Sequence, residues 1–405
     1  MSLFSAYFLD GKESPPTPST VYGILPSWLS GTLFINGPGR FHGMSHLFDG
    51  LALLHSFKLR PNTPPLYQAR YLRSASFIAS EAAGGVPRNR EFASSPGGFC
   101  GRIRTLAAGS SASDNANVAL VPFRGSLYAL TEAPVAWQID KSTLTTIAPW
   151  SDAPFSCRRS IFQVAATTSA HVLHHEGGIP NIFNGKPFSI FLTTRYTFGF
   201  SSSLVTGLYE ISLQSDDDND GGDVEREEIR FNILPITNEA PAYMHSFTAT
   251  ATRVILTEAP MRFSLPSMLY TVAVAPHGTP ITNGWPWNCD ANVIFRVADL
   301  NGGNNTIAFH VPGLPFFVLH HVNAWDDVES GGIYVDVVAY ENQDVLRDLS
   351  LHALRAGQFS SRGSALRRFF LHSKNGQTAL EIPFFTLLKQ LPSFELPTVS
   401  SRVVG

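Results

Sequence analysis

The chain has 405 residues, 44% of them hydrophobic, and a formal net charge of −3. That length allows a large buried core, and the charge excludes the basic surface of a nucleic-acid-binding protein. The three cysteines form no Cys-x-x-Cys pair, which indicates a reducing compartment and argues against a cysteine metal site.

Short runs rich in Val, Ile, Thr and Phe recur along the chain and are separated by Gly, Pro, Asn and Ser. This pattern predicts many short strands and therefore an all-β barrel, sandwich or propeller. The 32 glycines and 28 prolines fit the many turns of such a fold. In chain order, we expect strands at residues 32–35, 118–121, 126–130, 188–194, 252–257 and 332–338, and one or two helical turns at 344–354.

A glycine-rich segment with the sequence NGPGR, at residues 36–40, follows the first predicted strand. The next glycine, Gly43, comes one position too late for a dinucleotide-binding loop, and no helical pattern follows. We therefore predict a tight turn at this place rather than a nucleotide site.

An acidic stretch at residues 216–228 lies between two strand-like segments, 208–211 and 229–233. The spacing of an EF-hand calcium loop is matched by Asp216, Asp218, Asp220, Gly221 and Glu227. That loop needs a helix on either side, whereas both flanks alternate like strands. We therefore predict a solvated hairpin tip.

Three histidines, His171, His245 and His320, are separated by 74 and 75 residues and stand in aromatic or β-branched surroundings. Imidazole is the commonest metal ligand in proteins. A fold that repeats strands radially can bring such widely spaced histidines together on its axis. If the three converge, the chain is a metal enzyme; otherwise it is a β protein whose function stays open.

Six sequence blocks, taken in order, resemble the carotenoid cleavage oxygenase family from about residue 20 to about residue 400. The first is NGPG at 36–39 with HLFDG at 46–50 and LHSF at 54–57, and the second is DNANV at 114–118 with YALTE at 128–132. The segments around the three histidines come next: SAH at 169–171, YMHSF at 243–247 and FVLHHVNAW at 317–325. The last block is FELP at 394–397.

The resemblance implies an all-β, seven-bladed β-propeller with a non-haem Fe(II) on its axis, held by four histidines. By motif position, His171, His245 and His320 are the first three ligands. His320 is preferred to His321 because the family's ligand stands three residues before an asparagine, here Asn323. Neutral imidazoles suit Fe(II), and a set of them leaves coordination positions open for dioxygen.

The resemblance also implies residues around the ligands. In the family, glutamates accept hydrogen bonds from the metal-bound imidazoles, as carboxylates near metal sites commonly do. Glu132 and Glu395 match two of these positions. Ala116 stands where many members carry a threonine near the open iron position, so we expect more room at the metal and altered dioxygen binding.

One departure from the family concerns the end of the sequence. The family continues well beyond the FELP block and carries its fourth histidine there, and neither His352 nor His372 matches the motif of that ligand. We therefore expect a single carotenoid-oxygenase-like domain over residues 1–405 that lacks the family's C-terminal portion, with a propeller incomplete at that end. The chain is then either a fragment or a degenerate member with weakened iron binding.

The implied reaction is the cleavage of a conjugated C=C double bond of a carotenoid or apocarotenoid by O2, which gives two carbonyl products. Positioning of the lipophilic polyene in an apolar tunnel selects the bond. Stilbene-cleaving relatives carry a lysine where this chain has Thr131, which favours carotenoids. Stilbene cleavage and the isomerohydrolase chemistry of retinoid isomerases stay open, as does a catalytically inactive propeller that binds a lipophilic ligand or a protein partner.

The expected partners are the polyene substrate and O2, without nucleic acid. The N-terminus lacks the pattern of a signal peptide, and no apolar run approaches about 18 residues, so we expect a cytoplasmic protein. Peripheral contact with membranes or lipid droplets is left open, and no basic amphipathic helix in the sequence predicts it. The sequence does not determine the oligomeric state.

Overall fold

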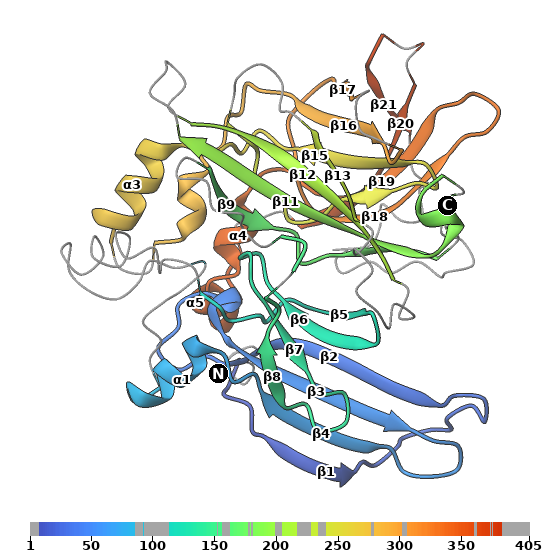
Figure 1. The fold of residues 1–405 in the computed structure, drawn as a ribbon. Helices are drawn as coiled ribbons and strands as arrows, with labels where there is room; N and C mark the ends of the chain where they lie inside the picture. Colours follow the sequence, from blue (N-terminus) through green and yellow to red (C-terminus); the bar gives the residue numbers. More distant parts are fainter. Residues whose placement is uncertain are drawn as a thin grey trace. The chain divides into compact units, whose positions relative to one another are not determined.

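The computed structural model describes residues 8–85, 92, 113–151, 153–155, 163–176, 179, 181–198, 205–216, 228–233, 240–276, 279–301, 306–359, 363–372, 374 and 376–382 (Figure 1). Its contacts divide the chain into two compact units. Unit 1 comprises Met1–Ala153, Thr271–Ile281 and Leu349–Gln358, and unit 2 comprises Pro154–Tyr270, Thr282–Asp348 and Phe359–Gly405. The single domain expected from the sequence stays a prediction.

Unit 1 contains two antiparallel sheets of four strands each. The first runs in the order β1-β4-β3-β2, with bounds Ser14–Pro18 (β1), Gly31–Arg40 (β2), Leu51–Leu59 (β3) and Leu66–Tyr71 (β4). The second runs in chain order through Ala119–Phe123 (β5), Ser126–Leu130 (β6), Ala136–Ile139 (β7) and Thr146–Pro149 (β8). The 3₁₀ helix η2 (Leu47–Asp49) and the helices α1 (Ala75–Ala82) and α5 (Leu351–Ala356) complete its described elements.

Unit 2 contains three antiparallel sheets. The first has the strands Gln163–Thr168 (β9), Leu173–His175 (β10), Phe188–Phe198 (β11), Val205–Ser215 (β12) and Glu228–Ile233 (β13). The second has Thr248–Ala249 (β14), Arg253–Glu258 (β15), Val293–Asp299 (β16) and Ile307–Val311 (β17). The third has Phe317–Asp326 (β18), Ile333–Tyr340 (β19), Ser364–Leu371 (β20) and Ala379–Ile382 (β21).

The described helices outside these sheets are short. They are α4 (Asp344–Asp348) and the 3₁₀ helix η3 (Phe183–Gly185) in unit 2, together with α3 (Leu265–Ala273) and the 3₁₀ helix η4 (Ile281–Gly284), which cross the unit boundaries. In the part of the chain that the structure describes, none of the helices has the length and hydropathy needed to cross a membrane.

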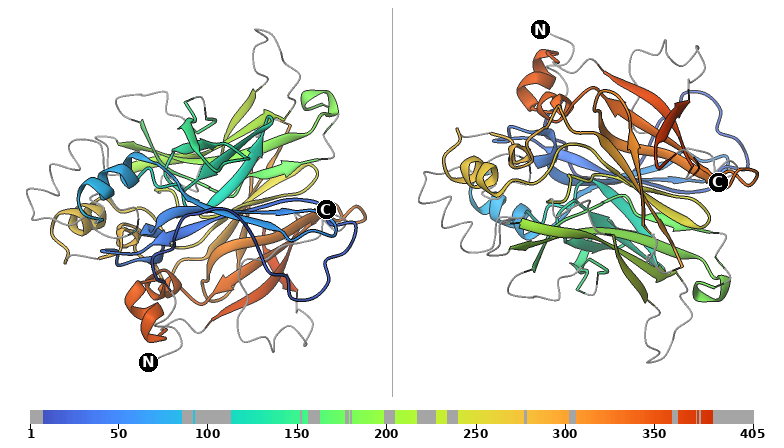
Figure 2. Two further views of the ribbon diagram at one scale, coloured as in Figure 1. Left: turned by 90° about the horizontal axis from the view of Figure 1, so that it is seen from below. Right: turned by 90° about the horizontal axis from the view of Figure 1, so that it is seen from above.

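The sheets of unit 2 pack face to face. Successive side chains of a strand point to opposite faces of its sheet, so apolar residues can fill a core on each face. On β15, Val254 and Leu256 enter a core that they share with β12, whereas Ile255 between them enters a second core shared with β19 and β20. Figure 2 shows the strands of the second and third sheets next to one another in both views, as this second core requires. Three sheets thus stack through two apolar layers.

Four of the five described sheets follow one design. Four consecutive antiparallel strands run in chain order from β5 to β8, β10 to β13, β14 to β17 and β18 to β21, which is how the blades of a propeller are built. The chain is therefore mostly β with few helices, as the sequence predicts. The closed ring of seven blades stays a prediction.

The sequence pattern places the strands correctly. Each predicted strand overlaps an observed one, namely β2, β5, β6, β11, β15 and β19. The segments that flank the acidic stretch are the neighbouring strands β12 and β13, as expected, while residues 217–227 at the predicted hairpin tip lie outside the described residues. The helical residues predicted at 344–354 are also confirmed, but they belong to two helices, α4 and α5. A new helix begins after Ser350, because the Ser350 hydroxyl caps α5 by accepting from the Ala353 amide.

The tight turn predicted at residues 36–40 is wrong, because these residues form the end of β2. The pairing shifts by one residue between Pro38, opposite Ala52, and Arg40, opposite Leu51, so Gly39 is the extra residue of a β-bulge. A Cβ on Gly39 would collide with the Leu53 side chain on β3. The glycine is needed for close packing of two strands and not for a reversal of the chain.

The second family block is held in unit 1 by asparagine side chains. Asn115 accepts from the Ala52 amide at 2.8 Å and donates to the Gly50 carbonyl at 2.8 Å. Asn117 donates to the carbonyls of Phe48 and Gly50 at 2.8 and 2.7 Å. These buried and partly buried hydrogen bonds join residues 114–118 to the HLFDG segment and to Ala52, so two blocks that are distant in sequence form one structural feature.

Candidate metal centre

Each of the three histidines stands at or near the beginning of a strand in a different sheet of unit 2. His171 lies two residues before β10, His245 three residues before β14, and His320 within β18. These are the strands with which the three chain-order runs begin. The 74- and 75-residue spacings therefore correspond to one sheet each, and repetition of the sheet design brings the side chains to one place.

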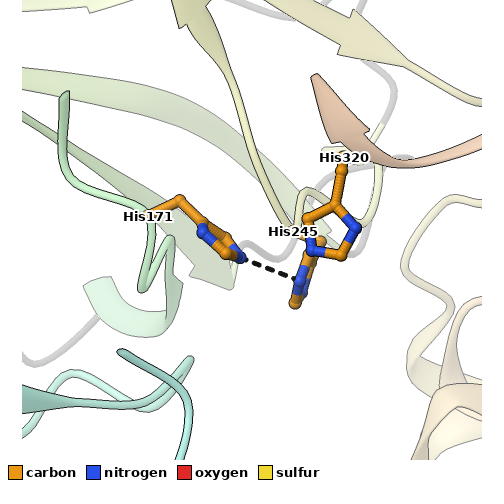
Figure 3. Close-up of side chains that lie close together, drawn as sticks. All are labelled: His171, His245 and His320. Carbon is orange, nitrogen blue, oxygen red and sulfur yellow. Dashed lines mark hydrogen bonds between the residues drawn. The ribbon is translucent and has the colours of Figure 1, made fainter. Parts of the chain in front are cut away.

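The three imidazoles converge (Figure 3). Their ligand nitrogens all lie within 4.8 Å of one another, and the Nε2 atoms of His171 and His245 are 3.1 Å apart. The ring centroids form a nearly equilateral triangle with sides of 4.8, 5.1 and 5.0 Å. His245 is buried, and His171 and His320 are partly exposed. Within the described residues, the cluster consists of these three side chains.

This donor set fits a divalent transition metal. Two imidazole nitrogens bound to one ion at about 2.1 Å lie roughly 3.0–3.4 Å apart for angles between a right angle and the tetrahedral value, and 3.1 Å falls in this range. Imidazole ligands suit zinc, copper, iron and nickel, whereas calcium and magnesium need oxygen ligands. The donor chemistry, together with the spacing of the His171 and His245 nitrogens, thus favours a transition metal without choosing among them.

His321, the neighbour of His320, takes a different place. Its Nε2 is 2.8 Å from the Thr257 hydroxyl and its Nδ1 is 2.8 Å from the Ser246 hydroxyl, so both ring nitrogens are engaged. Burial, followed by the nearby His320, His171 and His245, lowers the pKa of His321 to about 3. Of the two adjacent histidines, the structure brings His320 to the cluster, and its role as a ligand stays a prediction.

A serine hydroxyl links the first two histidine segments. Ser169, which is buried, accepts from the His171 amide at 3.1 Å and donates to the His245 carbonyl at 2.8 Å. Through the Ser169 hydroxyl, the backbone at His171 is linked to the backbone at His245, which lies 76 residues after Ser169. The sequence analysis did not single out Ser169, because an isolated serine beside a strand carries no signal of a long-range contact.

The two histidines rejected from the sequence as a fourth ligand stand elsewhere. His372 directly follows β20, where its Nε2 donates to the Ser330 carbonyl at 2.8 Å and its Nδ1 accepts from the Lys374 amide at 2.9 Å. His352 is exposed on α5 in unit 1.

The remaining predicted site residues fall in unit 1 or outside the described residues. Ala116, Thr131 and Glu132 are buried in unit 1, with Ala116 between the two asparagines that hold its segment. Glu395 lies outside the described residues. The roles predicted for Ala116, Glu132 and Glu395 stay predictions.

Comparison with known proteins decides the family. The model of a protein family described as "Retinal pigment epithelial membrane protein" matches residues 8–405. The chain belongs to this family, the carotenoid cleavage oxygenases. This membership confirms the resemblance that the sequence blocks indicate.

Named relatives agree with the family. A carotenoid isomerooxygenase of Galleria mellonella is 28% identical over 358 residues, and the match covers 86% of this chain and 63% of that protein. A mitochondrial carotenoid-cleaving dioxygenase of Macaca fascicularis is 27% identical over 387 residues, covering 89% of this chain and 63% of that protein. This chain therefore spans less than two thirds of the length of these carotenoid oxygenases.

The fold also has solved counterparts. A variant of the apocarotenoid oxygenase of Synechocystis superposes with a TM-score of 0.71 at 18% identity, and the superposition covers 94% of this chain and 71% of that one. The carotenoid oxygenase architecture is therefore retained across nearly the whole of this chain.

Proposed function

We propose that His171, His245 and His320 hold an Fe(II) ion and that the protein is an oxygenase which cleaves a conjugated C=C bond of a carotenoid or apocarotenoid. Two carbonyl products form as the alkene takes up both atoms of O2. The convergence of three imidazoles in a chain of the carotenoid oxygenase family is the observation that carries the proposal. The names of two relatives, a carotenoid isomerooxygenase and a carotenoid-cleaving dioxygenase, support the substrate class.

The chain supplies a neutral ligand set. Three uncharged imidazoles leave the full positive charge of a divalent ion in place, whereas carboxylates would neutralise it. When bound, non-haem iron supplies the one-electron chemistry that lets dioxygen react with an alkene. His320 lies on β18, and His171 and His245 directly precede strands of two other sheets, so each ligand is positioned by a different sheet.

Apolar residues that lie near two of the ligands in sequence are buried in the cores of unit 2. Met244 and Phe247 flank His245, and Phe317 and Leu319 precede His320 on β18, and all four are buried. The backbone around His245 and His320 is thus anchored in two apolar cores, while the imidazoles of His171 and His320 stay partly exposed. They contain no acid or base, so the proposal relies on positioning of the double bond and not on proton transfer.

The metal proposal is tested by loading the full chain with Fe(II) without oxygen and measuring bound iron after desalting. We expect about one iron per chain, and a loss of affinity of at least roughly 100-fold in His245→Ala, because one of three ligands is removed. His352→Ala, at an exposed helical histidine, is the matched control and should bind iron as the unchanged chain does. Absence of iron from the unchanged chain, or an equal loss in both variants, would contradict the metal site.

The reaction is tested separately with iron-loaded protein, an apocarotenoid and ¹⁸O2. Oxygen consumption should accompany the appearance of two labelled carbonyl products, detected by mass spectrometry, and His245→Ala should show neither. Resveratrol in place of the apocarotenoid tests stilbene cleavage. Iron binding without cleavage of any polyene would overturn the oxygenase proposal and leave a metal-binding protein of another kind.

A further inference from the structure

The strand that carries His320 is irregular where the histidine stands. Pairing with β19 shifts by one residue between Val318 and His321 and again between His321 and Asn323. His321 therefore lies between two β-bulges, and the backbone next to it makes fewer regular hydrogen bonds to β19. Side-chain contacts must supply the missing precision if His320 is to meet the other two histidines.

Alternation along β15 places a hydroxyl against this irregular region. Ile255 faces the core that the second and third sheets share, and Thr257, two residues later, faces the same way. The Thr257 hydroxyl is buried and lies 2.8 Å from Nε2 of His321. The two adjacent rings have different partners: His321 meets Thr257, and His320 meets the other two histidines.

The Ser246 hydroxyl completes the contact on the other side of the His321 ring. It donates to the Leu319 carbonyl at 2.7 Å, and it is 3.0 Å from the His321 amide and 2.8 Å from Nδ1 of His321. A hydroxyl has one hydrogen and two lone pairs. With its hydrogen given to Leu319, Ser246 accepts from both His321 groups, so Nδ1 carries the ring hydrogen and Nε2 accepts from Thr257.

A continuous chain of hydrogen bonds thus runs from Thr257 through the His321 ring and Ser246 to the Leu319 carbonyl. Two members of this chain, Ser246 and Leu319, are immediate sequence neighbours of cluster histidines. Ser246 follows His245 in sequence, and Leu319 precedes His320. The centroids of these two rings are 5.0 Å apart.

We propose that His321 is a positioning residue for the metal centre, which with Ser246 and Thr257 locks the His245 segment to the His320 strand before metal binds. The inference rests on the proposed metal role of the three histidines. His321 itself is not a ligand, since each of its ring nitrogens is occupied by a hydroxyl. Preorganised ligands bind metal more tightly because no ordering is left for the binding step.

Thr257→Val tests the proposal with little change of volume, because it removes the hydroxyl that donates to Nε2. Thr257→Ser retains the hydroxyl and should restore the function. Ser212→Ala is the matched control, since this buried hydroxyl of unit 2 bonds Glu228 on β13 at 2.6 Å. Cobalt(II) titration of the full chain, followed by visible absorption, measures metal affinity, and thermal unfolding of the metal-free proteins measures stability.

We expect Thr257→Val to weaken cobalt binding by about 10- to 100-fold, as is typical when residues around metal ligands are lost. Thr257→Ser and Ser212→Ala should stay within roughly threefold of the unchanged chain, even where Ser212→Ala lowers the unfolding temperature as much as Thr257→Val. An unchanged affinity in Thr257→Val, or an equal loss in Ser212→Ala, overturns the inference.

A crystal structure of metal-free Thr257→Val separates the two proposals. If the unchanged chain binds no cobalt, the proposed metal role is wrong. The crystal structure of metal-free Thr257→Val still tests whether Thr257 and His321 position the His320 ring. Movement of the His320 ring away from His245 supports the inference, and rings that stay in place, as in the unchanged chain, overturn it.

Discussion

At the scale of single residues, the imidazole rings differ in what their nitrogens contact. His320 presents its ring to two other imidazoles, whereas His321 and His372 use both nitrogens in hydrogen bonds to hydroxyl, carbonyl or amide groups. His55 on β3 is of a third kind, with its Nδ1 2.9 Å from the Tyr67 hydroxyl on β4. The contacts of its nitrogens thus distinguish each ring from the others.

His55 gives a prediction about pH. Burial lowers the pKa of His55 from its usual value of 6.5. The unfolded chain therefore takes up this proton at a higher pH than the folded chain does. The contribution of His55 to stability is complete above about pH 6.5 and is lost as the pH falls toward the folded pKa.

His55→Gln removes this titration and keeps a polar side chain. We expect the stability of the unchanged chain relative to His55→Gln to decrease between pH 7.5 and pH 5.5, measured as urea midpoints at roughly these two values. A difference that stays constant or grows on acidification would show that the ring protonates as readily in the folded state.

At the scale of elements, the alternation of apolar residues predicts strands well because burial of one face depends on neighbouring residues. It predicts interruptions less well. The helix α1 begins at the Ser74 cap, whose hydroxyl accepts from the Phe77 amide at 3.1 Å, and the Asp114 carboxylate accepts from the first two helical amides. Asp114 lies far along the chain, so the local pattern alone did not predict this helix.

The two glycines of the first family block offer a matched pair on β2. Gly39→Ala places a methyl group against the Leu53 side chain, and we expect a loss of about 1–3 kcal/mol in the free energy of unfolding. Gly37→Ala meets nothing within 4 Å and should change stability by less than about 0.5 kcal/mol. Denaturant unfolding of both variants measures the difference, and equal effects would argue against close packing at the bulge.

At the scale of the whole molecule, repetition of one sheet design organises unit 2. Three consecutive sheets begin near a histidine, and the two apolar cores between them keep the sheets in register with one another. The three ligands thus depend on the folded state of the entire unit. A metal that binds all three cannot bind the unfolded chain in the same way.

Metal binding should therefore stabilise the folded protein. At a free Fe(II) or cobalt(II) concentration of about 100 times Kd, we expect a gain of about 2.7 kcal/mol, seen as a higher unfolding temperature in calorimetry. His245→Ala should show little of this gain. The same increase in both proteins would mean that the metal binds elsewhere.

The sequence by itself determined the strand-rich fold, the family and the three histidines that converge. Strand patterns depend on neighbouring residues, and each spacing of 74 or 75 residues is the length of chain that forms one sheet. Both features can therefore be recognised in the sequence alone. Only the tertiary structure decided how the centre is held. Ser169, Ser246 and Thr257 look like ordinary strand residues in sequence, and their roles arise from hydrogen bonds to groups 64 to 76 residues away. Such contacts depend on how sheets pack, which no local pattern records.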